Sequence, residues 1–372
     1  MENIYQNRRK NVYSYMKQNK IAAAVFIDSE DKRESALRYL TGHPTDAVLV
    51  LFATEDCVLI PWDENLASKY ADADKIIPYT KFNCKSIAAV KSVLSEKGIE
   101  SGSSVCIPPS TTYIQAQKFI EELKDFNIIC KDESVHDYVV SLREVKDSYE
   151  IEQARKSCNI TKEITASIIK MLKNGEIKTE MDVALFIEKQ LRLLNAEKTS
   201  FDTLAAGNGR SYAIHAFPGY TQNSWGQSGL SILDYGVCFN GYASDCTITI
   251  ARNPDKEQEK LLQSVQTAFN ECLPLYKNGL PVRGAASKAD EVFARTNRSM
   301  PHGLGHGIGL EIHEAPFVSK KSGEDKLFKA GNIVTLEPGL YDINLGGTRL
   351  ENDVLITENG NEILTTSQIF YL

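Results

Sequence analysis

The chain has 372 residues, a formal net charge of −7, and the apolar (42%) and charged (24%) fractions of an ordinary globular protein. This length exceeds what one hydrophobic core usually organises, so we expect two domains. The lysines and arginines are scattered rather than clustered, which argues against a nucleic-acid-binding protein, and no apolar run approaches the ~20 residues that span a membrane.

The sequence favours a cytoplasmic location. Its first twenty residues are polar and contain no apolar core of signal-peptide length. The eight cysteines are spread singly, with no CxxC pair. This pattern is typical of free thiols in a reducing compartment rather than of a disulfide framework.

Residues 1–145 alternate short β-rich runs with helical patterns, which is typical of an α/β domain. His43 and His136 stand singly there, without a cluster of histidine, cysteine or carboxylate residues around them in the sequence. We therefore interpret both histidines as structural or simply exposed. Strands are expected at 22–27, 46–52 and 57–62, and helices at 84–98 and 113–126.

The charged stretch Arg143–Glu150 marks the boundary, so a second domain is expected over 146–372. A helix should begin where Asp147 is followed three residues later by Glu150, an arrangement typical of a capping box, and should end near Asn174–Gly175. A second helix should follow, with Thr179 and Asp182 in the capping positions. Both helices carry an apolar stripe, which indicates packing rather than chemistry.

After Leu230 the pattern changes to long strands, and Asn240–Gly241 is typical of a two-residue hairpin turn. Such a turn places Asp234 opposite Thr247 and Asp245 opposite Gly236, so the two aspartates become diagonal neighbours on one face, about 7–8 Å apart at the backbone. Two solvated surface aspartates are the simpler alternative, but the surrounding apolar residues indicate buried strands. Buried carboxylates that face each other repel, and a cation between them would relieve the repulsion.

The stretch HGLGHGIGLEIH, from His302 to His313, places three histidines on a glycine-rich backbone. His306 and His313 are seven residues apart, so they do not form a helical HExxH zinc site, and the glycines disfavour any helix. The spacing also differs from the GxGxxG dinucleotide loop. We expect the glycines to let the backbone approach a bulky group closely, such as a metal centre or a substrate.

Two glutamates complete a candidate ligand set. Glu337 precedes Pro338, which favours extended geometry, and Glu351 follows a turn at Gly346–Gly347, where it could equally be an exposed strand residue. Two aspartates, one histidine and two glutamates suit Mn²⁺ or Co²⁺, with Fe²⁺ and Zn²⁺ as alternatives. Five ligands exceed what one open catalytic ion needs, whereas two ions about 3.5–4 Å apart would use all five.

At these residues the sequence resembles the M24 metallopeptidase family, the pita-bread enzymes that include prolidase, aminopeptidase P, methionine aminopeptidase and creatinase. The resemblance covers essentially the whole chain, from ALRYLTG (Ala36–Gly42) to LITENG near the end, and HGLGHGIGLEIHE is its most specific segment. It implies an α+β chain with a C-terminal pita-bread (creatinase/aminopeptidase-like) catalytic domain. A smaller α/β domain of the creatinase/prolidase N-terminal, ribonuclease H-like type would precede it, and the chain would form a homodimer.

The resemblance also implies roles for individual residues. Glu337 would act both as a metal ligand and as the general base that takes a proton from a metal-bridging water and passes it to the leaving nitrogen. His215, His302 and His313 would line the substrate site and stabilise the tetrahedral intermediate, while Arg349 would orient a ligating carboxylate. Two divalent ions, Mn²⁺ foremost, would be held by Asp234, Asp245, His306, Glu337 and Glu351.

Within the family, five intact ligands count against the metal-independent creatinases and against non-catalytic binding modules, and the large N-terminal domain counts against methionine aminopeptidase. The compact length favours an Xaa-Pro dipeptidase acting on short proline-containing peptides; an Xaa-Pro aminopeptidase acting on longer peptides is the alternative. Two positions depart from the family pattern: Ile248 stands where relatives often have arginine, and Asn352 where an acidic residue commonly follows the last glutamate. Both bear on substrate range and on the surroundings of the ligands.

Overall fold

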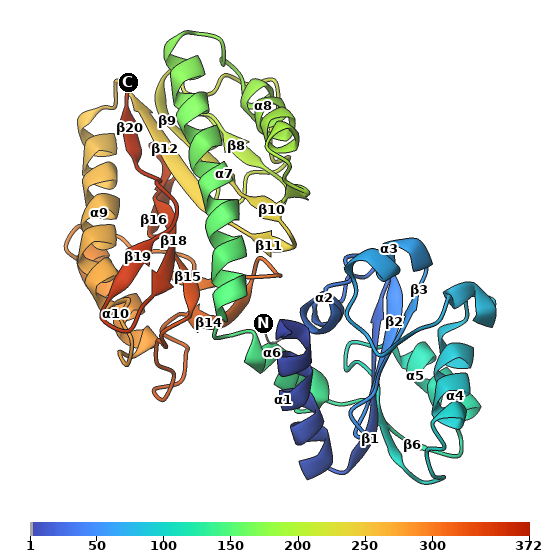
Figure 1. Ribbon diagram of the computed structural model, residues 1–372. Helices are drawn as coiled ribbons and strands as arrows, with labels where there is room; N and C mark the ends of the chain where they lie inside the picture. The colour runs from blue at the N-terminus through green and yellow to red at the C-terminus, as the bar shows by residue number, and fades with distance from the viewer. Residues whose placement is uncertain (1–2) are drawn as a thin grey trace. The chain divides into compact units, whose positions relative to one another are not determined.

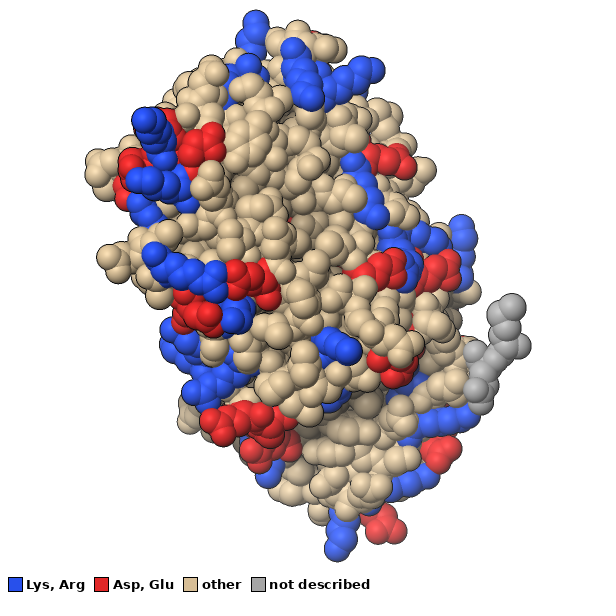
Figure 2. Space-filling view, turned by 90° about the vertical axis from the view of Figure 1, so that its left-hand side faces the viewer, with Lys and Arg blue, Asp and Glu red and all other residues tan. Residues whose placement is uncertain are grey.

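The computed structural model describes residues 3–372, which divide into two compact units at the Leu142–Arg143 junction (Figure 1). On the face shown in Figure 2, lysine and arginine side chains are interspersed with aspartate and glutamate. None of the helices within the described range is long and apolar enough to cross a membrane. All eight cysteines fall in that range and are free, most of them buried.

The first unit is a mixed sheet with strand order β4-β3-β2-β1-β5-β6 and helices around it. The expected strands and helices are confirmed, with ends that differ by up to four residues, the largest difference being at the end of the helix Tyr113–Glu122. His136 is buried, and its Nε2 lies 2.8 Å from the carbonyl oxygen of Val25. The elements are α1 (Ile4–Gln18), β1 (Ile21–Asp28), α2 (Ser35–Thr41), β2 (Ala47–Phe52), β3 (Cys57–Pro61), α3 (Glu64–Tyr70), β4 (Lys75–Ile76), α4 (Ser86–Glu96), β5 (Ser104–Cys106), α5 (Tyr113–Glu122), β6 (Asn127–Ile129) and α6 (Val135–Leu142).

The second unit is built on a large sheet with order β14-β13-β15-β18-β12-β9-β8, with β19 paired to β18 and β20 to β12. Its helices are α7 (Ser148–Lys173), α8 (Glu180–Leu193), α9 (Lys256–Cys272) and α10 (Val282–Ala294). Its strands are β7 (Lys198–Thr199), β8 (Leu204–Ala206), β9 (Gly229–Tyr235), β10 (Val237–Phe239), β11 (Tyr242–Ala243), β12 (Cys246–Arg252), β13 (Gly305–Gly307), β14 (Glu314–Val318), β15 (Ile333–Leu336), β16 (Gly339–Asp342), β17 (Gly346–Arg349), β18 (Glu351–Ile356), β19 (Asn361–Ile363) and β20 (Ile369–Tyr371).

Helices cover both faces of this sheet, with α7 and α8 on one side and α9 and α10 on the other (Figure 1). Side chains of a strand alternate between faces, and the two apolar clusters follow this rule. Leu233, Ile248 and Ile250 pack with α7 and α8. Leu230 and Ala251 lie an odd number of positions from those residues along their strands, so they point to the other face and pack with α9 and α10.

The helix caps and the hairpin turn that the sequence predicts in the second unit are confirmed. Asp147 and Glu150 form a capping box at the start of α7, and Thr179 and Asp182 form another at the start of α8. Asp234 pairs with Thr247 between β9 and β12, as the hairpin register requires. The turn residues Asn240 and Gly241 both have positive φ, 48° and 83°, which a two-residue turn of this kind demands.

Candidate metal centre

Adjacent strands bring three carboxylates to one end of the large sheet. Asp234 lies in β9, Glu351 begins β18, and Asp245 lies in the short break between β11 and β12. Because Leu233 and Ile248 point toward α7 and α8, Asp234 and Thr247 point to the opposite face. Thr247 pairs in turn with Glu351 across the β12–β18 ladder, so the strand register sets the positions of these acidic residues.

His306 and Glu337 reach the same place from β13 and from the end of β15. The positions on both sides of His306 require glycine. A Cβ on Gly305 would lie 2.0 Å from the carbonyl oxygen of Thr335, and one on Gly307 would lie 2.1 Å from that of Ala315. Gly305 and Gly307 therefore admit the backbone of neighbouring segments, and this close packing places His306. Gly303 and Gly305 also line the cavity described below.

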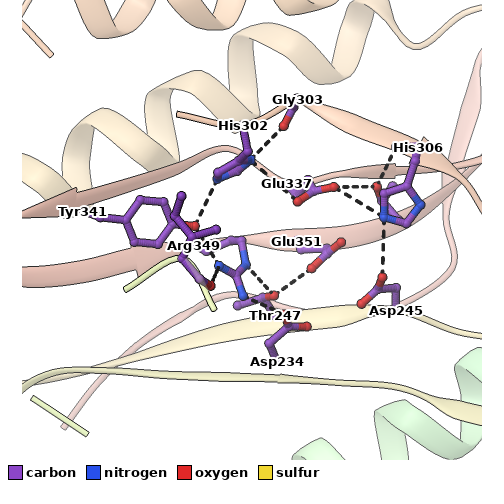
Figure 3. A network of polar contacts seen from close by, with 12 residues as sticks. Asp234, Asp245, Thr247, His302, Gly303, His306, Glu337, Tyr341, Arg349 and Glu351 are labelled. Atoms are coloured by element: carbon purple, nitrogen blue, oxygen red, sulfur yellow. Dashed lines mark hydrogen bonds and ion pairs between the residues drawn. The ribbon is translucent and has the colours of Figure 1, made fainter. Parts of the chain in front are cut away.

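The ligand atoms face one another (Figure 3). The Nε2 atom of His306 lies 3.7 Å from Asp245 Oδ2 and 3.5 Å from Glu337 Oε1. Its Nδ1 lies 3.0 Å from the carbonyl oxygen of Gly307, which can only accept, so Nδ1 carries the proton and the Nε2 lone pair points into the site. One ligand atom from each of Asp245, His306 and Glu351 lies within 4.8 Å of the other two.

The electrostatics of this cluster fit a bound cation. Desolvation raises the pKa of Asp245 and of Glu351 well above their usual values, and neighbouring carboxylates raise both further. Within residues 3–372, Oδ1 of Asp234 and Oδ1 of Asp245 are buried without a hydrogen-bond partner. Buried oxygens that lack partners, beside an imidazole lone pair, form a donor set that suits divalent metal ions.

Arg349 organises the acidic side chains. It lies at the end of β17, almost fully buried, and its Nη2 donates to Asp234 Oδ2 at 2.6 Å. Its Nε donates to the hydroxyl of Thr247 at 3.0 Å, and that hydroxyl donates to Glu351 Oε2 at 2.7 Å. Arg349 therefore holds one acidic residue directly and a second through Thr247.

Tyr341, in β16, extends this network and was not identified from the sequence. Arg349 Nη1 donates to its hydroxyl at 2.7 Å, and the hydroxyl in turn lies 3.0 Å from His302 Nε2. His302 Nδ1 donates to the carbonyl oxygen of Gly303 at 2.8 Å, so Nε2 accepts from the tyrosine. Desolvation lowers the pKa of His302, which favours this neutral form. The only sequence signal was the position of Tyr341 four residues after Glu337.

Asp353 is a second residue that the sequence did not single out. It is fully buried, and its Oδ2 accepts from the backbone N–H of Asp245 at 2.9 Å and from Cys158 Sγ at 3.4 Å. Desolvation raises the pKa of Asp353 to about 7. Asp353 therefore fixes the backbone that presents Asp245.

The two departures from the family pattern lie on the other face of the sheet. The side chain of Ile248 is buried in the apolar cluster under α7 and α8. Asn352 pairs with Cys246 on the same face, and its amide contacts Thr365 and Ser367 near the end of the chain. Neither side chain lines the cavity described next, so the apolar and amide residues at these positions leave the donor set intact.

A cavity of about 750 Å³ opens over the carboxylates. Its apolar lining includes Phe201, Ile214 and Phe317, and the rings of His306 and His313 lie 4.3 Å apart within it. The structure therefore brings all the candidate site residues to one place. Those that line the cavity are Asp234, Asp245, His306, Glu337, Glu351, His215, His302, His313 and Arg349.

Comparison with known proteins finds a family match for each of the two units. Residues 152–358 match the model of metallopeptidase family M24, and residues 8–145 match the creatinase/prolidase N-terminal domain. The Xaa-Pro dipeptidase of Pyrococcus horikoshii is 29% identical over 369 residues, 98% of each chain. The Xaa-Pro dipeptidase of Pyrococcus furiosus is 33% identical over 252 residues, which is 67% of this chain and 71% of that one.

A solved structure shows that the fold is shared along the whole length. The Xaa-Pro dipeptidase from Bacillus anthracis superposes with a TM-score of 0.85 at 25% identity, covering 99% of this chain and 100% of the other. The expected two-domain architecture, with a pita-bread domain after a creatinase/prolidase-type domain, is thereby confirmed. The chain is a hydrolase and belongs to metallopeptidase family M24.

Proposed function

We propose that this protein is a metal-dependent Xaa-Pro dipeptidase, which hydrolyses the Xaa–Pro bond of short proline-containing peptides. The observation that carries the proposal is the convergence of five donor residues and three further histidines on one cavity. The names of the relatives that match this chain along its length support the choice of substrate.

We assign two divalent ions to the site, Mn²⁺ foremost, with Co²⁺, Fe²⁺ and Zn²⁺ as alternatives. The oxygen-rich donor set of Asp234, Asp245, His306, Glu337 and Glu351 supports this choice. When bound, such a pair of ions acidifies a water molecule and polarises the peptide carbonyl.

The protein's own groups account for proton movement and orientation. Glu337 acts as the general base and delivers the proton to the leaving nitrogen; desolvation raises its pKa, although His302 and Arg349 partly offset this. His215 and His313 lie on the cavity wall, where their rings can donate to the substrate carboxylate and to the oxyanion. His302 lies between Tyr341 and Glu337, with Nδ1 3.8 Å from Glu337 Oε2.

Proline release from an Xaa-Pro dipeptide in the presence of Mn²⁺ tests the activity. We expect hydrolysis by the wild type and none by E337A, with folding intact in both. Faster turnover of Xaa-Pro-Xaa tripeptides than of dipeptides would instead indicate an Xaa-Pro aminopeptidase. A folded protein that takes up metal and releases no proline would be a binding module.

We further propose that the protein forms a homodimer and works in the cytoplasm. The first point follows from the family resemblance of the sequence, and the free, mostly buried cysteines support the second. Light scattering of the purified protein and fractionation of cells that express it test these two points separately.

A further inference from the structure

The segment from Gly207 to Thr221 carries His215 and forms the first part of the connection from β8 to β9. It has no regular secondary structure, yet it brings His215, Phe217 and Pro218 to the cavity wall. His215 is solvent-exposed, and Phe217 is 96% exposed. The position of His215 therefore depends on what holds the two ends of this segment.

One buried carboxylate holds both ends. Glu180 is the first residue of α8 and has no exposed surface. Its Oε1 accepts from the backbone N–H of Gly207 at 2.8 Å. Its Oε2 accepts from the backbone N–H of Thr221 at 2.8 Å and from the hydroxyl of Thr221 at 2.6 Å.

Arg210 connects this carboxylate to the middle of the segment. Its Nη1 forms an ion pair with Glu180, and its Nη2 donates to the carbonyl oxygen of Pro218, three residues after His215. On the other side of the histidine, the carbonyl oxygen of Ile214 accepts from Arg349 Nη1 at 3.1 Å. His215 is thus held between an anchor to Arg349 and an anchor to the Glu180–Arg210 pair.

We propose that Glu180 and Arg210 are positioning residues that set the place of His215 in the substrate cavity. This inference rests on the proposed function and deepens it. Glutamine cannot replace Glu180, because its amide group would direct N–H donors at either Gly207 or Thr221 and Arg210, which are all donors themselves. A small displacement of a residue that contacts substrate is enough to lower turnover substantially.

The first test is a double-mutant cycle measured with an Xaa-Pro dipeptide and Mn²⁺. We expect R210M to lower kcat/KM by about 10-fold in the wild-type background and by less than about 2-fold in an H215A background, because an effect exerted through His215 disappears with it. R210K, which restores a charge beside Glu180 but not the second contact to Pro218, should lie between R210M and the wild type. Metal content should be unchanged, since the segment contains no candidate metal ligand.

The matched control is R155M. Arg155 likewise makes two contacts and pairs with a glutamate, but both contacts go to Glu362 and lie outside the cavity lining. We expect R155M to leave kcat/KM at the wild-type value. An R210M loss that is equally large in the H215A background, or an R155M loss of the same size, would overturn the proposal.

Hydrogen exchange gives a second measurement that does not depend on the substrate. In R210M, and in R210K to a smaller extent, amide exchange across residues 207–221 should rise by about 5-fold or more, while β9, β12 and β18 exchange as in the wild type. Unchanged exchange in 207–221 would overturn the proposal even if activity fell. If the wild type hydrolyses no Xaa-Pro peptide, the proposed function fails and the exchange data still decide the role of Arg210.

Discussion

Two groups of buried carboxylates in the second unit differ in how their charge is balanced. Glu314, directly after His313, contacts two buried cations: it pairs with Arg143 and lies 3.1 Å from Lys146 Nζ. Burial favours the neutral form of Glu314, but Lys146 and Arg143 outweigh it, and its pKa lies below the usual value. Asp245 and Glu351 are buried as deeply, and their pKa values are raised by burial and by the charges of neighbouring carboxylates.

This difference separates a structural acid from a metal-binding one. A carboxylate neutralised by the protein's own cations stabilises the fold as it stands. A cluster of buried carboxylates with too few neighbouring cations lowers the stability of the metal-free protein, because the carboxylates repel one another. A bound divalent cation relieves this repulsion, so such a cluster indicates a metal site. Glutamate thus serves opposite purposes within one sheet, because Glu314 begins β14 and Glu351 begins β18.

The largest expected effect is that of E351Q. Removing one negative ligand should lower metal affinity and reduce kcat/KM by about 10³-fold or more. In EDTA at pH 8, however, E351Q should unfold at a higher temperature than the metal-free wild type, because like-charge repulsion is relieved. Thermal unfolding with and without Mn²⁺ measures both effects; a less stable metal-free variant would contradict the assignment of Glu351 to the uncompensated group.

E314Q should lower the stability of the metal-free protein, whereas E351Q should raise it. E314Q leaves Lys146 buried without its charge partner and leaves the buried Arg143 with only the half-exposed Glu311. Breaking a buried pair in this way typically costs about 3–5 kcal/mol of unfolding free energy. The loss should be the same in EDTA and in Mn²⁺, because Glu314 is no part of the donor set. Urea unfolding provides the measurement. The exposed pair Arg155–Glu362 supplies the control, since E362Q should cost less than about 1 kcal/mol.

H302A should have a smaller effect, confined to turnover. The variant removes the ring beside Glu337 but none of the donors, so we expect about a 10²-fold lower kcat with metal content unchanged. Y341F, which removes the hydroxyl between Arg349 and His302, should lower kcat by about 10-fold, the equivalent of one good hydrogen bond. Metal analysis of both variants accompanies the kinetics; metal loss in H302A would show that it supports the ligands instead.

Much of the site could be predicted from local sequence signals. The Asn240–Gly241 turn fixes the hairpin, and the two-residue period of the strands then places Asp234 and Thr247 on one face. The capping boxes likewise fix the starts of α7 and α8. These features depend on neighbours in the chain, so the sequence contains them directly.

Other features depend on contacts between distant segments and could not be predicted. Tyr341 matters because its hydroxyl contacts His302, 39 residues away, and Asp353 because β18 lies beside the backbone of Asp245. The glycines around His306 were expected to admit a ligand, but a single sequence does not show which strand will pack against them. Long-range pairing decides each of these cases.

The last prediction concerns the first unit and its pH dependence. Burial lowers the pKa of His136 from 6.5 to about 4. Between these values the unfolded chain binds more protons than the folded one, so this residue's contribution to stability is complete above pH 6.5 and is lost as the pH falls toward 4. At pH 5 the loss of unfolding free energy should be about 2 kcal/mol relative to pH 7.

The variant H136Q tests this prediction. It keeps an N–H donor for the Val25 carbonyl but cannot titrate, so its stability should change less over this range. Hydrogen exchange of β1 and β2 at pH 7 and pH 5, corrected for intrinsic rates, measures the difference, and equal slopes for the two proteins would show that His136 does not control the acid sensitivity of this sheet.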